Sequence, residues 1–114
     1  MKIEQIPEEL NNKVRLSIHA SLFTGEKTFT ELKELTGATD GNLSTQLTKL
    51  EKYKSISEKK EFIGKKPCTK YNITEKGLAN FKNYIELLEN VIKSSELKWG
   101  HYGKIKNIFK YFII

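Results

Sequence analysis

The sequence predicts a mainly helical fold with one small β-hairpin, and three observations support this prediction. Apolar residues recur at helical spacing over residues 10–23, 32–50 and 78–92. Threonine caps and glycine stops separate these segments. Over residues 56–73 the pattern changes, because β-branched and aromatic residues flank a Gly-Lys-Lys-Pro turn. A chain of 114 residues has the length of one compact domain with one modest core.

The first two predicted helices differ in length. The first follows Pro7 and extends for about four turns to Gly25. Its apolar residues are Leu10, Val14, Ile18 and Leu22 at fourfold spacing, with Leu16 and Phe23 beside them. In the short second helix, Thr28 stands three residues before Glu31, the spacing of a capping box, although Thr30 could equally be the cap. Its apolar pair is Leu32 and Leu35, and Gly37 is expected to end it.

The third predicted helix, about residues 39–53, begins at the cap Thr39 and follows the second helix closely. Its buried stripe consists of Leu43, Leu47 and Leu50. Its flanks and outer side carry few charges and consist of Asn42, Ser44, Thr45, Gln46, Thr48 and Lys49. Amide and hydroxyl groups can pair with base edges in the major groove of DNA, whereas phosphate repels a carboxylate. Asp40 is the exception, and we expect it to stabilise the helix dipole.

The predicted hairpin, about residues 56–73, is rich in lysine. Residues 49–70 carry eight lysines against three glutamates, which accounts for most of the formal net charge of +6. This concentration predicts phosphate contacts by a hairpin lying along the DNA backbone or minor groove, although a solvated charged face is the alternative. The predicted DNA-binding residues are Asn42, Ser44, Thr45, Gln46, Lys49, Lys59, Lys60, Lys65 and Lys66.

A long fourth helix is predicted over about residues 74–95, capped by Thr74. One apolar strip consists of Leu78, Phe81, Ile85, Leu88 and Ile92, and a second strip beside it of Tyr84, Leu87 and Val91. So wide a face exceeds what one contact with a small core absorbs. We expect Leu78 and Phe81 to contact the core, and a homodimer interface of Tyr84, Leu87, Leu88, Val91 and Ile92. Alternatively, the first helix and the tail cover this strip within one chain.

Two short helices joined by a tight turn and followed by a lysine-tipped hairpin are the arrangement of a winged helix-turn-helix. We therefore predict this fold with a long C-terminal dimerisation helix. Residues 1–95 form the domain, and residues 96–114 form an extension that packs on the dimer. The extension is basic and apolar over "KIKNIFKYFII", so a marginal helix on a membrane surface is the alternative for it.

Composition narrows the function classes. A pI of about 9.3 favours a polyanionic partner, although a lysine-rich composition also accounts for it, since Arg15 is the only arginine among 20 basic residues. Cys68 is the single cysteine, which excludes an intrachain disulfide and a cysteine metal site. The sequence shows neither a signal peptide nor a membrane span, so we expect a soluble, cytoplasmic protein without a membrane partner.

A catalytic or metal site is not predicted. His19 and His101 are the only histidines and have no partner at ligand spacing. Cys68 could sense redox state through nearby Lys66 and Lys70, but a half-exposed strand residue is the favoured interpretation. No glycine-rich phosphate loop is present. We therefore predict no catalytic residue, metal or cofactor, and a protein that is not an enzyme.

The stretches "FTELKELTGATDGNLSTQLTKLE" and "FIGKKPCTKYNITEKGLANFKNYIELLE" resemble the winged-helix DNA-binding domain family of small transcriptional regulators, relatives of the MarR and ArsR types. The resemblance covers about residues 12–93. It implies a winged-helix fold, homodimerisation through the terminal helix and sequence-specific operator binding. It also implies recognition-helix positions at Ser44, Thr45, Gln46 and Lys49, and a wing tip at Lys65 and Lys66.

Three features depart from that family pattern. Cys68 stands where similar proteins often carry arginine, which puts minor-groove reading by the wing in question. Lys54 stands where glycine usually ends the recognition helix, and a left-handed conformation there would cost about 1 kcal/mol. The segment after residue 95 lies beyond the resemblance.

The sequence thus predicts a homodimeric, sequence-specific DNA-binding transcriptional regulator, more specifically a repressor that occludes a promoter. Its predicted partners are double-stranded DNA, a second copy of itself and an unidentified small-molecule effector. The alternative is a winged-helix protein-interaction module without sequence-specific DNA binding, which docks through the fourth helix and the tail.

Overall fold

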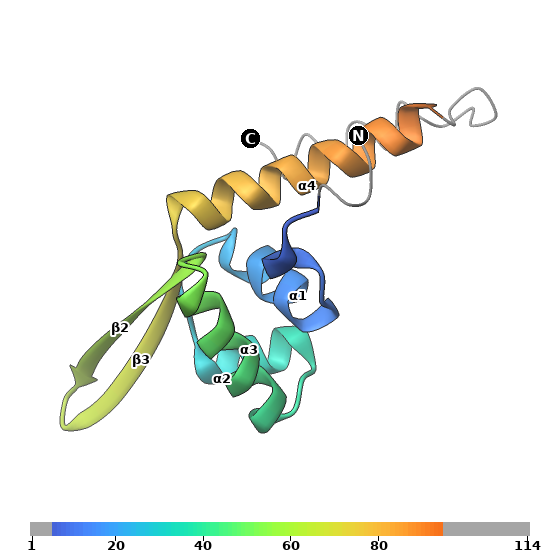
Figure 1. Ribbon diagram of the computed structural model, residues 1–114. Helices are drawn as coiled ribbons and strands as arrows, with labels where there is room; N and C mark the ends of the chain where they lie inside the picture. The colour runs from blue at the N-terminus through green and yellow to red at the C-terminus, as the bar shows by residue number, and fades with distance from the viewer. Residues whose placement is uncertain (1–5, 95–114) are drawn as a thin grey trace.

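The computed structural model of the protein describes residues 6–94. Along the chain it contains η2 (Glu8–Leu10), α1 (Lys13–Leu22), β1 (Lys27–Thr28), α2 (Phe29–Thr36), α3 (Asp40–Lys52), β2 (Ile56–Ile63), β3 (Lys66–Ile73) and α4 (Glu75–Ser94). In Figure 1 the helices α1 to α3 form one group, the β2–β3 hairpin projects to one side of it, and α4 runs along the side of α1. The predicted order of helices and hairpin is confirmed.

The hairpin belongs to a three-stranded antiparallel sheet with the order β1-β3-β2. The two-residue strand β1 pairs with β3 at Lys27–Tyr71 and Thr28–Lys70, and no pattern in the sequence predicted this strand. In the hairpin, Ile56 pairs with Ile73 at the base and Ile63 with Lys66 at the tip. Strand β1 therefore holds the base of the hairpin against the start of α2.

The prediction of one long first helix is wrong, because the chain breaks at Asn12. Asn12 has an extended backbone, and its side-chain oxygen accepts hydrogen bonds from the backbone nitrogens of Val14 and Arg15 at 2.9 and 3.0 Å. This is the geometry of a helix N-cap. Helix α1 therefore begins at Lys13, and the residues before it form the separate 3-10 turn η2.

The caps of α2 and α3 are confirmed. Thr28, rather than Thr30, caps α2: its hydroxyl accepts from the Glu31 nitrogen at 3.2 Å, and the Glu31 carboxylate accepts from the Thr28 nitrogen at 3.0 Å. Gly37 ends α2 with φ 70°. The Thr39 hydroxyl then accepts from the Asn42 nitrogen at 3.2 Å and starts α3. Short-range signals therefore set the tight turn between the two helices.

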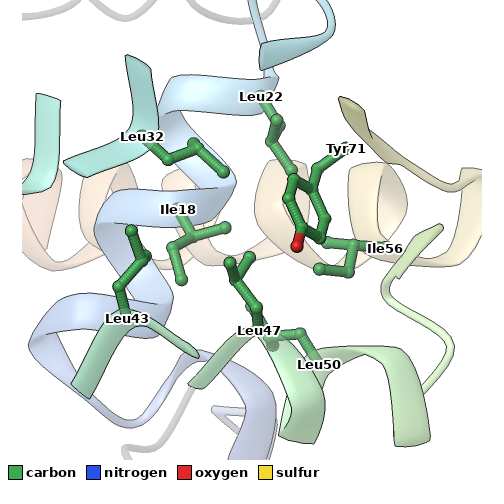
Figure 2. Close-up of a cluster of buried hydrophobic side chains, with 8 residues drawn as sticks. All are labelled: Ile18, Leu22, Leu32, Leu43, Leu47, Leu50, Ile56 and Tyr71. Atoms are coloured by element: carbon green, nitrogen blue, oxygen red, sulfur yellow. The ribbon is translucent and has the colours of Figure 1, made fainter. Parts of the chain in front are cut away.

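The main core joins α1, α2 and α3 to the base of the hairpin. Figure 2 shows its side chains converging from α1, α2, α3 and both long strands: Ile18, Leu22, Leu32, Leu43, Leu47, Leu50, Ile56 and Tyr71. The predicted leucine stripe of α3 is thus confirmed. Leu35 was predicted to form the apolar pair of the second helix with Leu32, but it does not join the core, since 56% of it is exposed. Helix α2 packs through Phe29 and Leu32, and Leu35 turns away from that face.

Helix α4 packs on α1 and η2 through a second cluster. Phe81 and Ile85 of α4 bury themselves against Leu10, with Phe23 and Tyr84 partly buried beside them. The predicted core contact of Phe81 is confirmed, and its ring lies 5.7 Å from that of Phe23. The N-terminal half of α4 is therefore fixed to the helical group.

His19 is a buried titratable group in this α1–α4 contact. It is stacked on Phe81 with ring centroids 6.3 Å apart, and its Nδ1–H donates to the Arg15 carbonyl oxygen at 2.7 Å. Its Nε2 is buried and has no hydrogen-bond partner among residues 6–94. Burial lowers the pKa of His19 below its ordinary value of 6.5. The fold therefore favours the neutral imidazole.

We expect this histidine to make the protein acid-sensitive. Because the folded-state pKa is lowered, the contribution of neutral His19 to stability is fully present above about pH 6.5 and is lost as the pH falls through the folded-state pKa. Urea unfolding at about pH 7.5 and pH 5 should show a larger loss in the wild type than in His19→Leu. An equal loss in both proteins would contradict this assignment.

Helix α3 ends at a left-handed lysine. Lys54 has φ 62°, and the next nitrogen, that of Ser55, donates back to the Leu50 carbonyl at 3.0 Å. This pattern closes many helices, and glycine is the usual residue at the left-handed position. Lys54 adopts the left-handed conformation itself, at a cost of about 1 kcal/mol. The turn sends the chain into β2.

Gly77 allows α4 to start close to this turn. A Cβ at Gly77 would overlap the Ser55 carbonyl oxygen and lie 2.9 Å from the Ile73 side chain. We expect Gly77→Ala to lower the free energy of unfolding by about 1–3 kcal/mol. Gly41→Ala is the matched control, because nothing lies within 4 Å of that Cβ; helix propensity should raise its stability by up to about 1 kcal/mol. Urea unfolding would contradict this packing if both variants were stabilised.

Candidate nucleic-acid interface

The outer face of α3 is polar and open. Leu43, Leu47 and Leu50 fix the roll of the helix by pointing into the core. The opposite side exposes Asn42, Ser44, Thr45, Thr48 and Lys49, as predicted. No carboxylate lies on this face between residues 41 and 50. Asp40, at the first turn, instead pairs with Lys33 of α2 at 2.7 Å. The face therefore offers hydrogen-bonding groups and one positive charge.

Gln46 is a correction to the predicted site. It is only 7% exposed, and its Oε1 accepts a 2.7 Å hydrogen bond from Arg15 Nη1 of α1. Its Nε2 donates to Asn42 Oδ1 at 3.1 Å. The amide is therefore occupied inside the fold, because the buried guanidinium of Arg15 needs an acceptor there. The prediction that Gln46 faces outward is wrong.

The threonine hydroxyls of the outer face are held in place by the helix. Thr45 Oγ1 donates to the Gly41 carbonyl at 2.8 Å, and Thr48 Oγ1 donates to the Ser44 carbonyl at 3.0 Å. Each oxygen keeps lone pairs that can accept a hydrogen bond. Fixed acceptors on a face without carboxylates suit contact with the amino groups of bases.

In the middle of the hairpin, acidic neighbours neutralise the lysines. Lys59 lies 3.5 Å from Glu61, and Lys60 lies 3.5 Å from Glu58. Lys70 lies 2.9 Å from Glu61, which lowers the pKa of that glutamate and raises the pKa of the lysine. Lys59 and Lys60 were both predicted to contact phosphate, and each carries an ion pair in the free chain. The sequence showed the lysine excess but not these ion pairs, of which only Lys70–Glu61 joins β3 to β2.

The tip of the hairpin keeps its positive charge. A two-residue loop, Gly64 and Lys65, connects the strands, and Gly64 has φ 67°. Lys65 and Lys66 are exposed, and no acid within residues 6–94 forms an ion pair with either. Their predicted place at the tip of the wing agrees with the structure. The uncompensated charge of the hairpin is therefore concentrated where it projects furthest from the core (Figure 1).

The predicted dimer strip on α4 is narrower than expected. Leu88 and Val91 are 38% and 51% exposed. Tyr84 packs partly against the second cluster, and Ile92 is half-buried. Leu87 is only 5% exposed, contrary to its expected place on an open strip. The predicted tail, residues 96–114, lies outside the described residues.

A hollow of about 360 Å³ opens beside the C-terminal end of α3. It is lined by Glu8, Arg15, Lys49, Lys52 and Tyr53. Basic groups outnumber the single acid, so the hollow is electropositive. No pattern in the sequence predicts this hollow, because η2, α1 and α3 meet there only in the folded chain.

The described residues show no metal centre. No group of three or more His, Cys, Asp or Glu side chains within 6–94 is placed to hold an ion. Cys68 lies half-buried on β3 as a free thiol. No helix in the described part of the chain has both the length and the apolar character needed to cross a membrane.

A helix-turn-helix pair, a basic hairpin and a long packing helix define a winged helix-turn-helix, a fold that places α3 as the recognition helix and the hairpin as the wing. The chain belongs to the winged helix DNA-binding domain family, whose model matches residues 14–92. An uncharacterized protein of Methanocaldococcus jannaschii is 40% identical over 87 residues, which are 75% of this chain and 95% of that protein.

Solved structures agree with this family. A protein of Enterococcus faecalis named as a MarR-family transcriptional regulator is 26% identical with a TM-score of 0.74, covering 84% of this chain and 87% of its own. A transcriptional regulator homologue of Pyrococcus horikoshii is 28% identical with a TM-score of 0.69, covering 76% of this chain and 87% of its own. Fold and family thus point to a MarR-like transcriptional regulator rather than to an enzyme.

Proposed function

We propose that the protein is a homodimeric, sequence-specific DNA-binding repressor that occludes a promoter. In this arrangement α3 enters the major groove and the wing lies along the backbone or the minor groove. The observation that carries the proposal is the pairing of two surfaces. A carboxylate-free, hydrogen-bonding face on α3 lies in the same domain as a hairpin whose tip lysines have no ion-pair partner among residues 6–94.

Each exposed group has a specific part in this mechanism. Ser44, Thr45 and Thr48, with Asn42, contact base edges and supply sequence preference. Lys49, Lys65 and Lys66 contact phosphates and supply affinity that does not depend on sequence. Gln46 has a structural part and does not contact DNA, because its hydrogen bond with Arg15 holds the recognition helix α3 against α1.

Dimerisation brings two recognition helices to two half-sites. Half-sites about 34–36 Å apart place both helices on the same side of the duplex. The exposed part of α4, including Leu88, is the proposed contact surface. Two weak contacts joined in one molecule multiply the affinity for a palindromic operator.

The test of this function is DNA selection. The wild type should be retained on random duplex DNA at low salt, and repeated selection should yield a palindromic consensus sequence. Gel filtration of the complex would give the number of chains per duplex. Indifference to duplex DNA and to heparin would instead favour a protein-interaction module.

Thr45 provides a sharper test of base reading. We expect Thr45→Val, which keeps the shape but removes the hydroxyl, to cost about 1 kcal/mol of discrimination at one base pair of the selected site. Thr45→Ser keeps the hydroxyl and should retain the preference. Competition binding with single-base-pair variants of the site measures this. Unchanged discrimination in Thr45→Val would place this side chain outside the groove.

A further inference from the structure

The tip of the wing carries two apolar side chains that the proposed function has not used. Phe62 is 73% exposed and Ile63 is 62% exposed, the two highest values among the large hydrophobic residues that the structure describes. They precede the Gly64–Lys65 loop, and their cross-strand partners are Pro67 and Lys66. Neither side chain contributes to the two core clusters. Their exposure therefore has no explanation in the packing of the chain.

The register of the hairpin separates the two side chains. Successive side chains of a strand point to opposite faces, so Phe62 lies on the same face as Ile56, which is buried in the core beside α3. Ile63 lies on the opposite face. At about 3.3 Å per residue, Phe62 lies about 20 Å beyond Ile56 along the strand. This reach is similar to the half turn of about 17 Å between neighbouring grooves on one side of a duplex.

The surroundings of Phe62 suit the minor groove. Lys65 and Lys66 are exposed beside it, and no acidic residue occurs between residues 62 and 69. The lysines can neutralise the phosphates that line a groove. Apolar side chains that enter the minor groove act as wedges between base pairs, where they partly unstack a step and bend the duplex. The ring also leaves water when it is inserted.

We propose that Phe62 enters the minor groove of the bound duplex as an apolar wedge, opens one base step and bends the DNA. This inference rests on the proposed DNA-binding function. Lys65 and Lys66 bind the flanking phosphates, while Ile63 remains on the solvent side of the hairpin. The wing then recognises deformable steps, which contributes to site choice without a hydrogen bond to any base.

The experiment uses a duplex selected by the wild-type protein, labelled at both ends for energy transfer and carrying 2-aminopurine at the steps next to the α3 site. We expect the wild type to bend this duplex by at least about 20° and to raise the 2-aminopurine fluorescence at one step. Phe62→Ala should lose most of both signals and bind about tenfold more weakly. Ile63→Ala is the matched control on the other face and should stay within about twofold of the wild type.

The possible outcomes distinguish a failure of the Phe62 wedge from a failure of the proposed DNA-binding function on which it rests. If the wild type fails to bind any duplex, the proposed function fails and the wedge fails with it. If it binds but leaves the duplex straight and stacked, or if Phe62→Ala bends it equally, only the wedge is overturned. Cosedimentation with phosphatidylserine vesicles that Phe62→Ala abolishes, with the DNA signals unchanged, would also overturn the wedge in favour of a membrane contact.

Discussion

Replacing both Lys65 and Lys66 by alanine should weaken binding to every duplex, whatever its sequence. Both lysines are exposed at the tip of the wing and form no ion pair with the acids of the described chain. Each phosphate contact contributes about 0.9 to the slope of log K against log salt, so the double variant should lose about 1.8 of that slope. We expect an affinity about 10- to 100-fold lower at low salt. Fluorescence anisotropy from about 50 to 200 mM salt measures both quantities.

Lys59→Ala with Lys60→Ala is the matched control for this prediction. These two lysines carry the same formal charge as the tip pair but lie 3.5 Å from Glu61 and Glu58 in the free chain. Binding DNA through them requires breaking these ion pairs, so their removal should cost less affinity and change the salt slope less. Equal effects of the two double variants would show that the tip has no special part in binding.

Removing the buried guanidinium of Arg15 should cause the largest loss of stability outside the apolar cores. Arg15 is 5% exposed and donates to Gln46 Oε1 at 2.7 Å and to the Glu8 carbonyl at 3.1 Å. Arg15→Met keeps much of the side-chain length but leaves the amide of Gln46 without its donor. We expect a loss of about 2–4 kcal/mol in the free energy of unfolding, against a total of about 5–15 kcal/mol for a small domain.

A double-mutant cycle tests whether this loss comes from the Arg15–Gln46 hydrogen bond. Gln46→Met alone leaves a buried charge with one acceptor fewer, and should also destabilise the fold. In the double variant neither group is left unpaired across the contact, so its loss should be smaller than the sum by about 1–2 kcal/mol. Additive losses in urea unfolding would show that the two side chains act independently.

Local signals made most of the fold predictable. Caps such as Thr28 and Thr39 act within three residues of their own position, and the leucine stripe of α3 follows from helical spacing. The resemblance placed Lys54 where glycine usually ends the recognition helix, and the structure gives it the left-handed conformation that glycine favours there. Where a second local signal competed, the prediction failed: the strong cap at Asn12 divides the first helix, although the apolar spacing continues through it.

The candidate site was less predictable, because its chemistry depends on contacts between distant segments. Gln46 fits an outward polar pattern until Arg15, 31 residues earlier, reaches its amide. The pairing of β2 with β3 likewise brings Lys70 within 2.9 Å of Glu61, a carboxylate that Lys59 of the same strand also approaches. The exposure of Phe62 could not be predicted from the sequence either, since an aromatic residue in a strand usually indicates a buried face.

The most direct test of the proposed function is to map where the outer face of α3 and the tip of the wing contact DNA. Cys68 is the only cysteine, so a Cys68→Ser protein can carry one new cysteine and one attached iron–EDTA cleavage reagent. With the reagent at Thr45→Cys, we predict strand cuts that face the major groove at the centre of each half-site. At Lys65→Cys the cuts should face the minor groove about half a turn away. Glu86→Cys, on the exposed side of α4, measures the background cleavage. If neither position gives cuts above this background, the proposed contacts of α3 and the wing with DNA are contradicted.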